Sequence, residues 1–165
     1  MNDLVQGGLY SAVLDSTELD PLREEDALQE AQLLDSRVCY LTSTAAVIFE
    51  LRTSLHFYVG NSALLVVRGL RSFDWNSPTR LTPLAALTVM SSIPGQLGES
   101  FHVKFGLFPE AHLSLVGDLA EFYVLESEGL GEAPPDYSSL DLRQVQDNLP
   151  SWSSACSLLQ ASISR

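Results

Sequence analysis

The possible folds of this chain are limited first by the stretch from Val38 to Phe73, which is rich in β-branched and aromatic residues. Such residues favour strands, and Gly60-Asn61 divides the stretch into two runs. Because glycine in the first position of a two-residue loop suits a type II′ turn, the pattern predicts a β-hairpin. The predicted register pairs these residues: Val59 with Ser62, Phe57 with Leu64, Leu55 with Val66 and Leu51 with Leu70.

A second hairpin is predicted around Phe108-Pro109-Glu110, because apolar residues alternate on both sides of this segment. A two-residue loop would set apolar residues opposite polar ones. A three-residue loop matches the faces and pairs Phe105 with Leu113 and Val103 with Leu115. We therefore expect the odd-length loop.

A helix is predicted over residues 20–34, after a poorly specified arm at 1–19. Asp20 can cap its first turn, and Pro21 suits the first helical position because its missing N–H would have no partner there. The apolar stripe of this helix would consist of Leu22, Ala27, Leu28, Ala31 and Leu34.

Residues 84–93 fit either a strand or a short helix, and their β-branched residues favour the strand. Leu119–Leu125 is apolar on both faces, so it predicts a buried strand. Residues 126–137 are rich in glycine, proline and acids and predict a loop, followed by a helical C-terminal segment at 138–163 that Ser138 or Ser139 would cap.

These elements predict a single α+β domain over residues 1–165, with its strand-rich core at 37–125. The expected sheet is mostly antiparallel, has about five or six strands, and is accompanied by an N-terminal helix and one or two C-terminal helices. The longest apolar run, Ala45–Phe49, has five residues, against the ~18 that a membrane helix needs. With two cysteines and no glycosylation sequon, the sequence predicts a cytoplasmic protein in which Cys39 is a small buried hydrophobe.

The chain is strongly acidic, with a formal net charge of −12 at pH 7. Nine acids and one base lie in residues 1–36, and nine acids and two bases lie in residues 109–165. This charge disfavours binding to nucleic acid or to an anionic membrane, because both need clustered lysine and arginine. It favours either a basic protein partner, attracted by the long-range field, or solubility alone.

No motif in the sequence predicts catalysis, a cofactor or a metal. The three histidines, His56, His102 and His112, lack ligand spacing, and the expected register of the second hairpin separates His102 from His112. Gly60–Leu64 lacks the final glycine of a nucleophile elbow, and Gly129–Pro134 has proline in place of the third glycine of a dinucleotide fingerprint.

Arg68 falls on the apolar face of the first predicted hairpin, so it needs a partner. It is either an arginine that bonds to a nearby acid or, with Arg71 and Trp75, an anchor for a partner. The predicted partner-binding residues are Glu24, Glu25, Asp26, Arg68, Arg71, Trp75, Glu126, Glu128, Glu132 and Asp136.

We therefore expect an acidic protein-interaction module, such as an inhibitor or immunity-type protein that binds a basic partner. Two other classes stay open: a small-molecule-binding or structural accessory domain, and an enzyme whose residues leave no linear motif. An apolar pocket with convergent polar groups would favour the small-molecule-binding domain.

Overall fold

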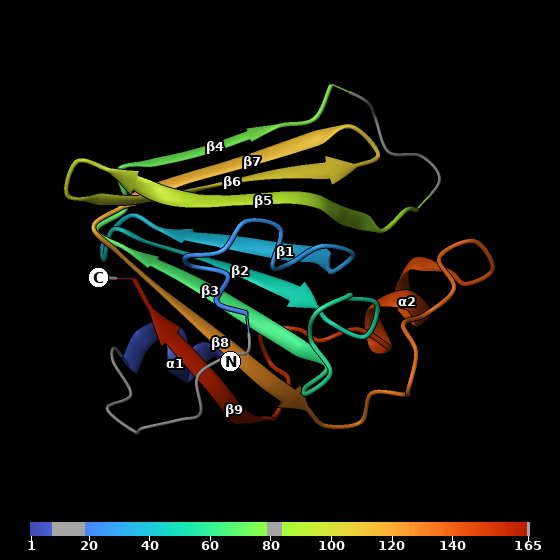
Figure 1. Ribbon diagram of the computed structural model, residues 1–165. Helices are drawn as coiled ribbons and strands as arrows, with labels where there is room; N and C mark the ends of the chain where they lie inside the picture. Colours follow the sequence, from blue (N-terminus) through green and yellow to red (C-terminus); the bar gives the residue numbers. More distant parts are fainter. Residues whose placement is uncertain (8–18, 79–83, 165) are drawn as a thin grey trace.

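The computed structural model describes residues 1–7, 19–78 and 84–164, which contain one antiparallel sheet and two short helices (Figure 1). The strand order is β4-β7-β6-β5-β1-β2-β3-β8-β9. The helices are α1 (Asn2–Gly7) and α2 (Leu142–Asp147). The strands are β1 (Gln32–Cys39), β2 (Thr44–Glu50), β3 (Ser62–Arg68), β4 (Ser72–Asn76), β5 (Leu87–Leu97), β6 (Ser100–Phe108), β7 (Ala111–Gly117), β8 (Leu119–Ser127) and β9 (Cys156–Ile163).

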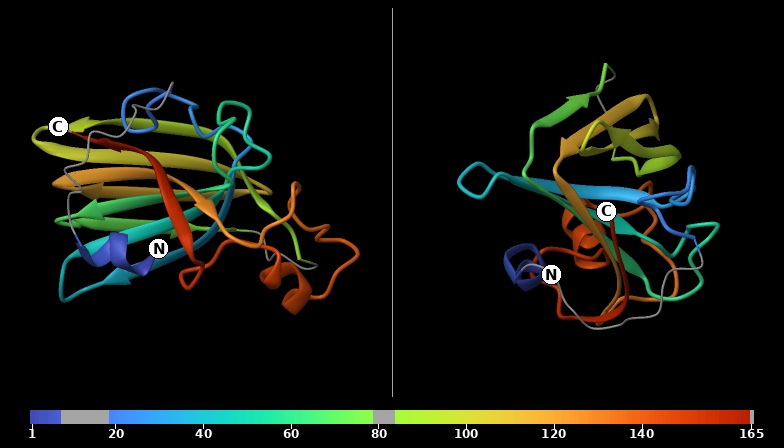
Figure 2. Two further views of the ribbon diagram at one scale, coloured as in Figure 1. Left: turned by 90° about the horizontal axis from the view of Figure 1, so that it is seen from below. Right: turned by 60° about the vertical axis from the view of Figure 1, so that its left-hand side comes forward.

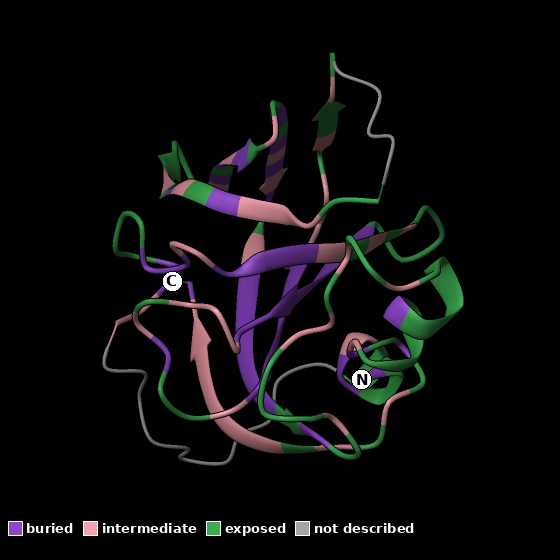
Figure 3. Cartoon of the chain, turned by 90° about the vertical axis from the view of Figure 1, so that its right-hand side faces the viewer, coloured by how far each residue is buried: buried purple, intermediate pink, exposed green. Residues whose placement is uncertain are grey.

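The sheet is folded so that its two halves face each other (Figures 1 and 2). Strands β4 to β7 form one half and the remaining strands form the other. Within the described residues β1 pairs with β5 at Gln32↔Thr88 and Leu33↔Leu87. The main core fills the space between the halves, where Phe49 of β2 contacts Phe105 of β6 with ring centroids 5.5 Å apart. Figure 3 shows the buried residues gathered along the central strands.

A second, smaller core covers the other face of β2, β3 and β8. Met1 and Leu4 of the α1 region and Trp152 of the C-terminal segment pack there against Ile48 and Tyr123. The central strands are therefore buried on both faces, which requires apolar residues at successive positions rather than at alternate ones.

The helix predicted over residues 20–34 is wrong. Asp20 does cap one turn, because its side chain accepts from the backbone N–H of Leu22, but Asp26 and Glu30 adopt positive φ angles of 58° and 66° that end any helix. The backbone bonds to β5 instead, and Leu28 is buried in the main core. This segment fills the opening between β5 and β1, and its last residues already belong to β1.

The hairpin predicted at Gly60-Asn61 has the wrong register. Strand β2 does pair with β3, but Glu50 lies opposite Ser62, so residues 51–61 form a long loop (the 51–61 loop). The glycine serves another purpose: a Cβ at Gly60 would lie 2.8 Å from the carbonyl oxygen of Leu125 on β8. Close approach to a third strand explains this glycine, whose φ is 79°.

The α+β class with five or six strands and C-terminal helices is also wrong, because the two described helices have six residues each and the sheet has nine strands. Within the predicted helical segment 138–163 only α2 is helical, with a capping box on Asp141 instead of a serine cap, and residues 156–163 pair with β8 as an edge strand. Strand β8 extends to Ser127, so the predicted loop at 126–137 begins later.

The second hairpin is confirmed, including its three-residue loop and the pairs Phe105↔Leu113 and Val103↔Leu115. The strand preference for residues 84–93 is confirmed from Leu87 onward, and Leu119–Leu125 is a strand buried mostly on both faces. Cys39 is exposed, contrary to its expected burial. Of the predicted arm, residues 2–7 form α1, and 8–18 lie outside the described residues. Neither described helix is long and apolar enough to cross a membrane.

Candidate functional site

The two predicted acidic segments lie on either side of the 51–61 loop. On one side, the carbonyl oxygen of Gln29 accepts from the N–H of Leu55, and that of Glu30 accepts from the hydroxyl of Thr53. On the other side, Arg52 donates to the carbonyl oxygens of Gly131 and Ala133, each at 2.9 Å. The fold thus attaches both acidic segments to one loop, which the sequence did not show.

The acids themselves are exposed, and some also accept hydrogen bonds from the protein, Asp26 from the N–H of Ser92 and Glu126 from the amide of Asn61. All seven predicted acids are classed as exposed: Glu24, Glu25, Asp26, Glu126, Glu128, Glu132 and Asp136. Asp136 accepts hydrogen bonds from the hydroxyls of Ser138 and Ser139 and from the Ser138 N–H, which lower its pKa to about 2. It therefore keeps its charge at mildly acidic pH.

The 51–61 loop, to which both acidic segments are hydrogen-bonded, carries three exposed apolar side chains. Leu55 is 49% exposed, Val59 52% and Tyr58 85%. A hollow of about 120 Å³ lies beside Tyr58 and is also lined by Leu19 and Gln160. We call this loop, together with the seven acids, the acidic surface. It combines exposed apolar side chains with exposed carboxylates, as many protein interfaces do.

A buried ion pair holds this surface in place. Glu50 is fully buried at the end of β2, and its carboxylate binds the guanidinium of Arg52, whose side chain is 5% exposed. Arg52 also donates to the carbonyl oxygen of Asn148, so one guanidinium ties β2 to two parts of the C-terminal segment. Because charged donors form strong hydrogen bonds, the loop has a rigid attachment.

The other predicted partner-binding residues lie elsewhere. Arg68 binds the fully buried Glu121 on β8 and the carbonyl oxygens of Leu4 and Val5, so it is an arginine with an internal acid partner. Its Glu121 partner also accepts from Tyr123, whose pKa is raised by burial. Exposed Arg71 pairs with Asp118 in the link from β7 to β8.

Trp75 is 45% exposed on β4, the edge strand of the other half of the sheet. No hydrogen bond between described residues joins Trp75 or Arg71 to the acidic surface. The structure therefore separates these two residues from the acids with which they were grouped.

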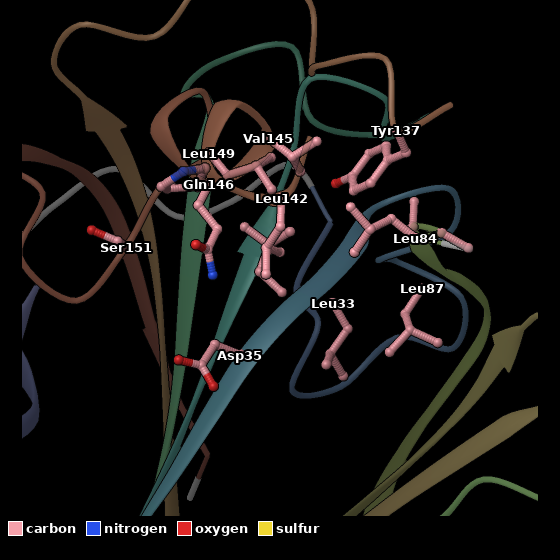
Figure 4. Close-up of a pocket in the computed structure, with 14 residues that line it drawn as sticks. Leu33, Asp35, Leu84, Leu87, Tyr137, Leu142, Val145, Gln146, Leu149 and Ser151 are labelled. Carbon is pink, nitrogen blue, oxygen red and sulfur yellow. The ribbon is translucent and has the colours of Figure 1, made fainter. Parts of the chain in front are cut away.

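A cavity of about 470 Å³ opens where residues 84–86 diverge from β1 (Figure 4). We call it the β1–α2 cavity, because α2 and the residues that follow it cover the opening. Most of its lining is apolar: Leu33, Leu34, Leu84, Ala85, Ala86, Leu87, Leu142, Val145, Leu149 and Pro150. Figure 4 shows Asp35, Gln146 and Ser151 on one side of it and Leu33, Leu84 and Leu87 on the other.

Tyr137 closes one end of the β1–α2 cavity, and its hydroxyl donates to Gln32 at 2.7 Å. Burial, followed by the charge of nearby Glu50, raises the pKa of Tyr137 to about 12. The phenol therefore stays neutral at physiological pH and acts as a fixed hydrogen-bond donor.

A second cavity of about 410 Å³ lies further along β1, between that strand and α1. Trp152 stands between the two: its ring lies under the guanidinium of Arg37, 4.5 Å away, and its indole N–H donates to Asp35. Exposed Cys39 also lines this second cavity, and hydrogen bonds from Thr42 lower its thiol pKa.

Among the described residues, no three histidine, cysteine, aspartate or glutamate side chains gather closely enough to hold a metal ion. His112 lies opposite Gly106, as its register predicted. The buried Nδ1 of His102 has no hydrogen-bond partner in the part of the chain that the structure describes, and its ring packs against Gly95 on the neighbouring strand.

Comparisons of the chain with protein families, with curated proteins and with solved structures find no match. Function is therefore argued from the two features with a defined geometry, the acidic surface and the β1–α2 cavity. Sequence reasoning identified the acids of the first feature but missed Tyr58 and Leu55 as its exposed centre. It missed the cavity entirely, because the residues that line it come from segments far apart in the chain.

Proposed function

We propose that this chain is a protein-interaction module that binds a basic protein partner through the acidic surface. The observation that carries the proposal is the position of the 51–61 loop, with exposed Leu55, Tyr58 and Val59, between two acidic segments hydrogen-bonded to it. An inhibitor or immunity-type protein that covers a basic enzyme or toxin would need such a surface.

The two parts of the surface have different physical roles. Burial of Tyr58 against a partner would supply affinity, because exposed aromatic side chains become the strongest contacts once they are desolvated. The surrounding carboxylates would accelerate encounter with a positively charged protein, because long-range attraction acts on the association rate. If the acids served solubility alone, their positions around the loop would not affect binding.

The test compares two variants that each change the net charge from −12 by the same three units. The surface variant carries Glu25→Gln, Glu128→Gln and Glu132→Gln, three exposed acids of the acidic surface. The matched control carries Asp3→Asn, Asp74→Asn and Glu99→Gln, three exposed acids outside it. A partner is captured from the source cells with wild-type protein, purified, and its association followed by stopped-flow fluorescence at low and high salt.

The proposal predicts that the surface variant associates about tenfold more slowly than the control at low salt, and that high salt removes the difference. Equal association rates for the two variants would reject the acidic surface and leave the charge as a solubility device. A partner with an acidic isoelectric point would reject the proposed partner class.

A second comparison tests the apolar centre of the surface. Tyr58→Ser should raise the dissociation rate at least tenfold, whereas Tyr40→Ser, at the tip of the β1–β2 turn, should leave it unchanged. The pair is matched because Tyr58 is 85% exposed and Tyr40 90%, so neither substitution disturbs the core. Equal effects of the two substitutions would show that Tyr58 is outside the interface.

A further inference from the structure

The β1–α2 cavity has the size of a small-molecule site, and it has one apolar side and one polar side. Its volume of about 470 Å³ lies within the range of roughly 300–1,000 Å³ that is common for ligand pockets. Its apolar side is built from leucines of β1, of residues 84–87 and of α2, so an apolar body placed there would lose water on several sides.

The polar side of the cavity presents hydrogen-bond acceptors. The carboxylate of Asp35 accepts one bond on each oxygen, from the Ser36 N–H at 2.8 Å and from the Trp152 indole N–H at 2.6 Å. An ionised carboxylate has about four acceptor positions, so each oxygen can accept a further bond. Within the described part of the chain no cation lies within ion-pair distance of Asp35, and Figure 4 shows the Gln146 amide on the same side.

The surrounding charge favours a cation at this position. The C-terminal segment beside the cavity carries Asp136, Asp141 and Asp147 against Arg143, within a chain of net charge −12. Arg37, two residues beyond Asp35 on β1, stacks on the ring of Trp152 and makes no ion pair with Asp35. An anion would meet this field at a cost, whereas an ammonium group would be attracted.

We propose that the β1–α2 cavity binds a small amphiphilic amine. Its ammonium group donates to Asp35 and to the side-chain carbonyl of Gln146, and its alkyl or ring body packs among Leu33, Leu87 and Leu142. No residue that lines the cavity belongs to the acidic surface, so the site is independent of the proposed function.

The experiment uses the full-length protein and three eight-carbon probes of different charge: n-octylammonium, 1-octanol and octanoate. Affinities are measured by titration calorimetry and by tryptophan fluorescence, in which Trp75→Phe isolates the signal of Trp152. All probes are kept below the concentrations at which they aggregate. We expect n-octylammonium to bind about threefold to fivefold more tightly than octanol, since a partly exposed ion pair contributes a modest gain. Octanoate should bind more weakly than both.

Chain length tests the apolar side of the site. Each methylene added from hexylammonium to octylammonium should tighten binding about threefold to fourfold, as expected for burial of a CH₂ group. Equal affinities of n-octylammonium and octanoate, no dependence on chain length, or no binding at all would each overturn the proposal.

Substitutions of Asp35 and Gln146 test whether the ammonium group binds at the polar side of the cavity. Asp35→Asn keeps the side-chain shape and an acceptor for Trp152, and it should remove the preference for n-octylammonium over octanol. Gln146→Glu, on the exposed face of α2, should strengthen n-octylammonium binding about threefold, and Gln146→Lys should weaken it. These two exposed substitutions test the site even if Asp35→Asn does not fold.

Two controls separate this site from the acidic surface. Asp74→Asn, on the other half of the sheet, should leave binding unchanged, and so should the three glutamine substitutions of the surface variant. The opposite result would be a loss of n-octylammonium binding in the surface variant together with wild-type affinity in Gln146→Lys. It would place the amine on the acidic surface and overturn the cavity site. The proposed function would be left intact.

Discussion

Replacing Arg52 by leucine should destabilise the protein strongly. The substitution leaves the carboxylate of Glu50 fully buried without its cation and removes three hydrogen bonds to the carbonyl oxygens of Gly131, Ala133 and Asn148. Breaking a buried ion pair by removing one partner costs about 3–5 kcal/mol. We therefore expect Arg52→Leu to lower the free energy of unfolding by about that amount.

Urea denaturation followed by circular dichroism measures the loss, with Arg71→Leu as the control. Arg71 and Asp118 form an ion pair whose side chains are 62% and 58% exposed, so its removal should cost less than about 1 kcal/mol. A double variant, Glu50→Gln with Arg52→Leu, should recover part of the loss because no buried charge is left. An Arg52→Leu loss no greater than that of Arg71→Leu would refute the reasoning.

The same variant makes a second prediction. Amide exchange should rise in residues 128–140 of Arg52→Leu, because Arg52 attaches that segment to β2.

Two further predictions follow from close packing and from burial. Gly117→Ala should lower the free energy of unfolding by about 1–3 kcal/mol, because the added Cβ would collide with a methyl group of Val67. In the control Gly131→Ala the added Cβ has no atom nearer than 4.0 Å, so its free energy of unfolding should stay within about 0.5 kcal/mol of wild type. Urea denaturation measures both. The pKa of Tyr137 is raised from 10.0 to about 12, so the folded state keeps this proton longer and its free energy of unfolding should fall as the pH rises between these values. In Tyr137→Phe the slope of the unfolding free energy against pH should be shallower, by the equivalent of up to one proton. Urea denaturation at a series of alkaline pH values measures this slope, and a slope equal to that of wild type would contradict the assignment.

The two predicted hairpins show where sequence reasoning succeeds and where it does not. In the β6–β7 hairpin polar residues separate the apolar ones, so only one loop length matches the faces, and the register is correct. Strands β2 and β3 are buried on both faces and have polar residues only at their ends, so no alternation within them marks a wrong register. Gly60 suggested a tight turn there, but contact with Leu125 of β8 is what requires it.

The candidate site divides in the same way. The distribution of charge along the sequence identified the exposed acids, because aspartate and glutamate side chains are rarely buried unless they have a partner. It did not identify Tyr58 as exposed. The neighbouring Phe57 is only 9% exposed, and the change from buried to exposed within the 51–61 loop follows from the hydrogen bonds by which Arg52 and Gln29 hold the loop.

Local features of this protein could be predicted from its residues: the β6–β7 hairpin, strand β8 with apolar residues on both faces, and the acidic segments. These depend on residues close together in the chain, for which alternation, loop length and charge are sufficient. Three other features needed the folded structure: residues 20–31 fill the opening between β5 and β1, residues 156–163 form an edge strand, and Arg52 and Arg68 have buried acid partners. Each of these depends on contacts between residues distant in sequence, because their burial and hydrogen bonding override the local preference for helix or turn.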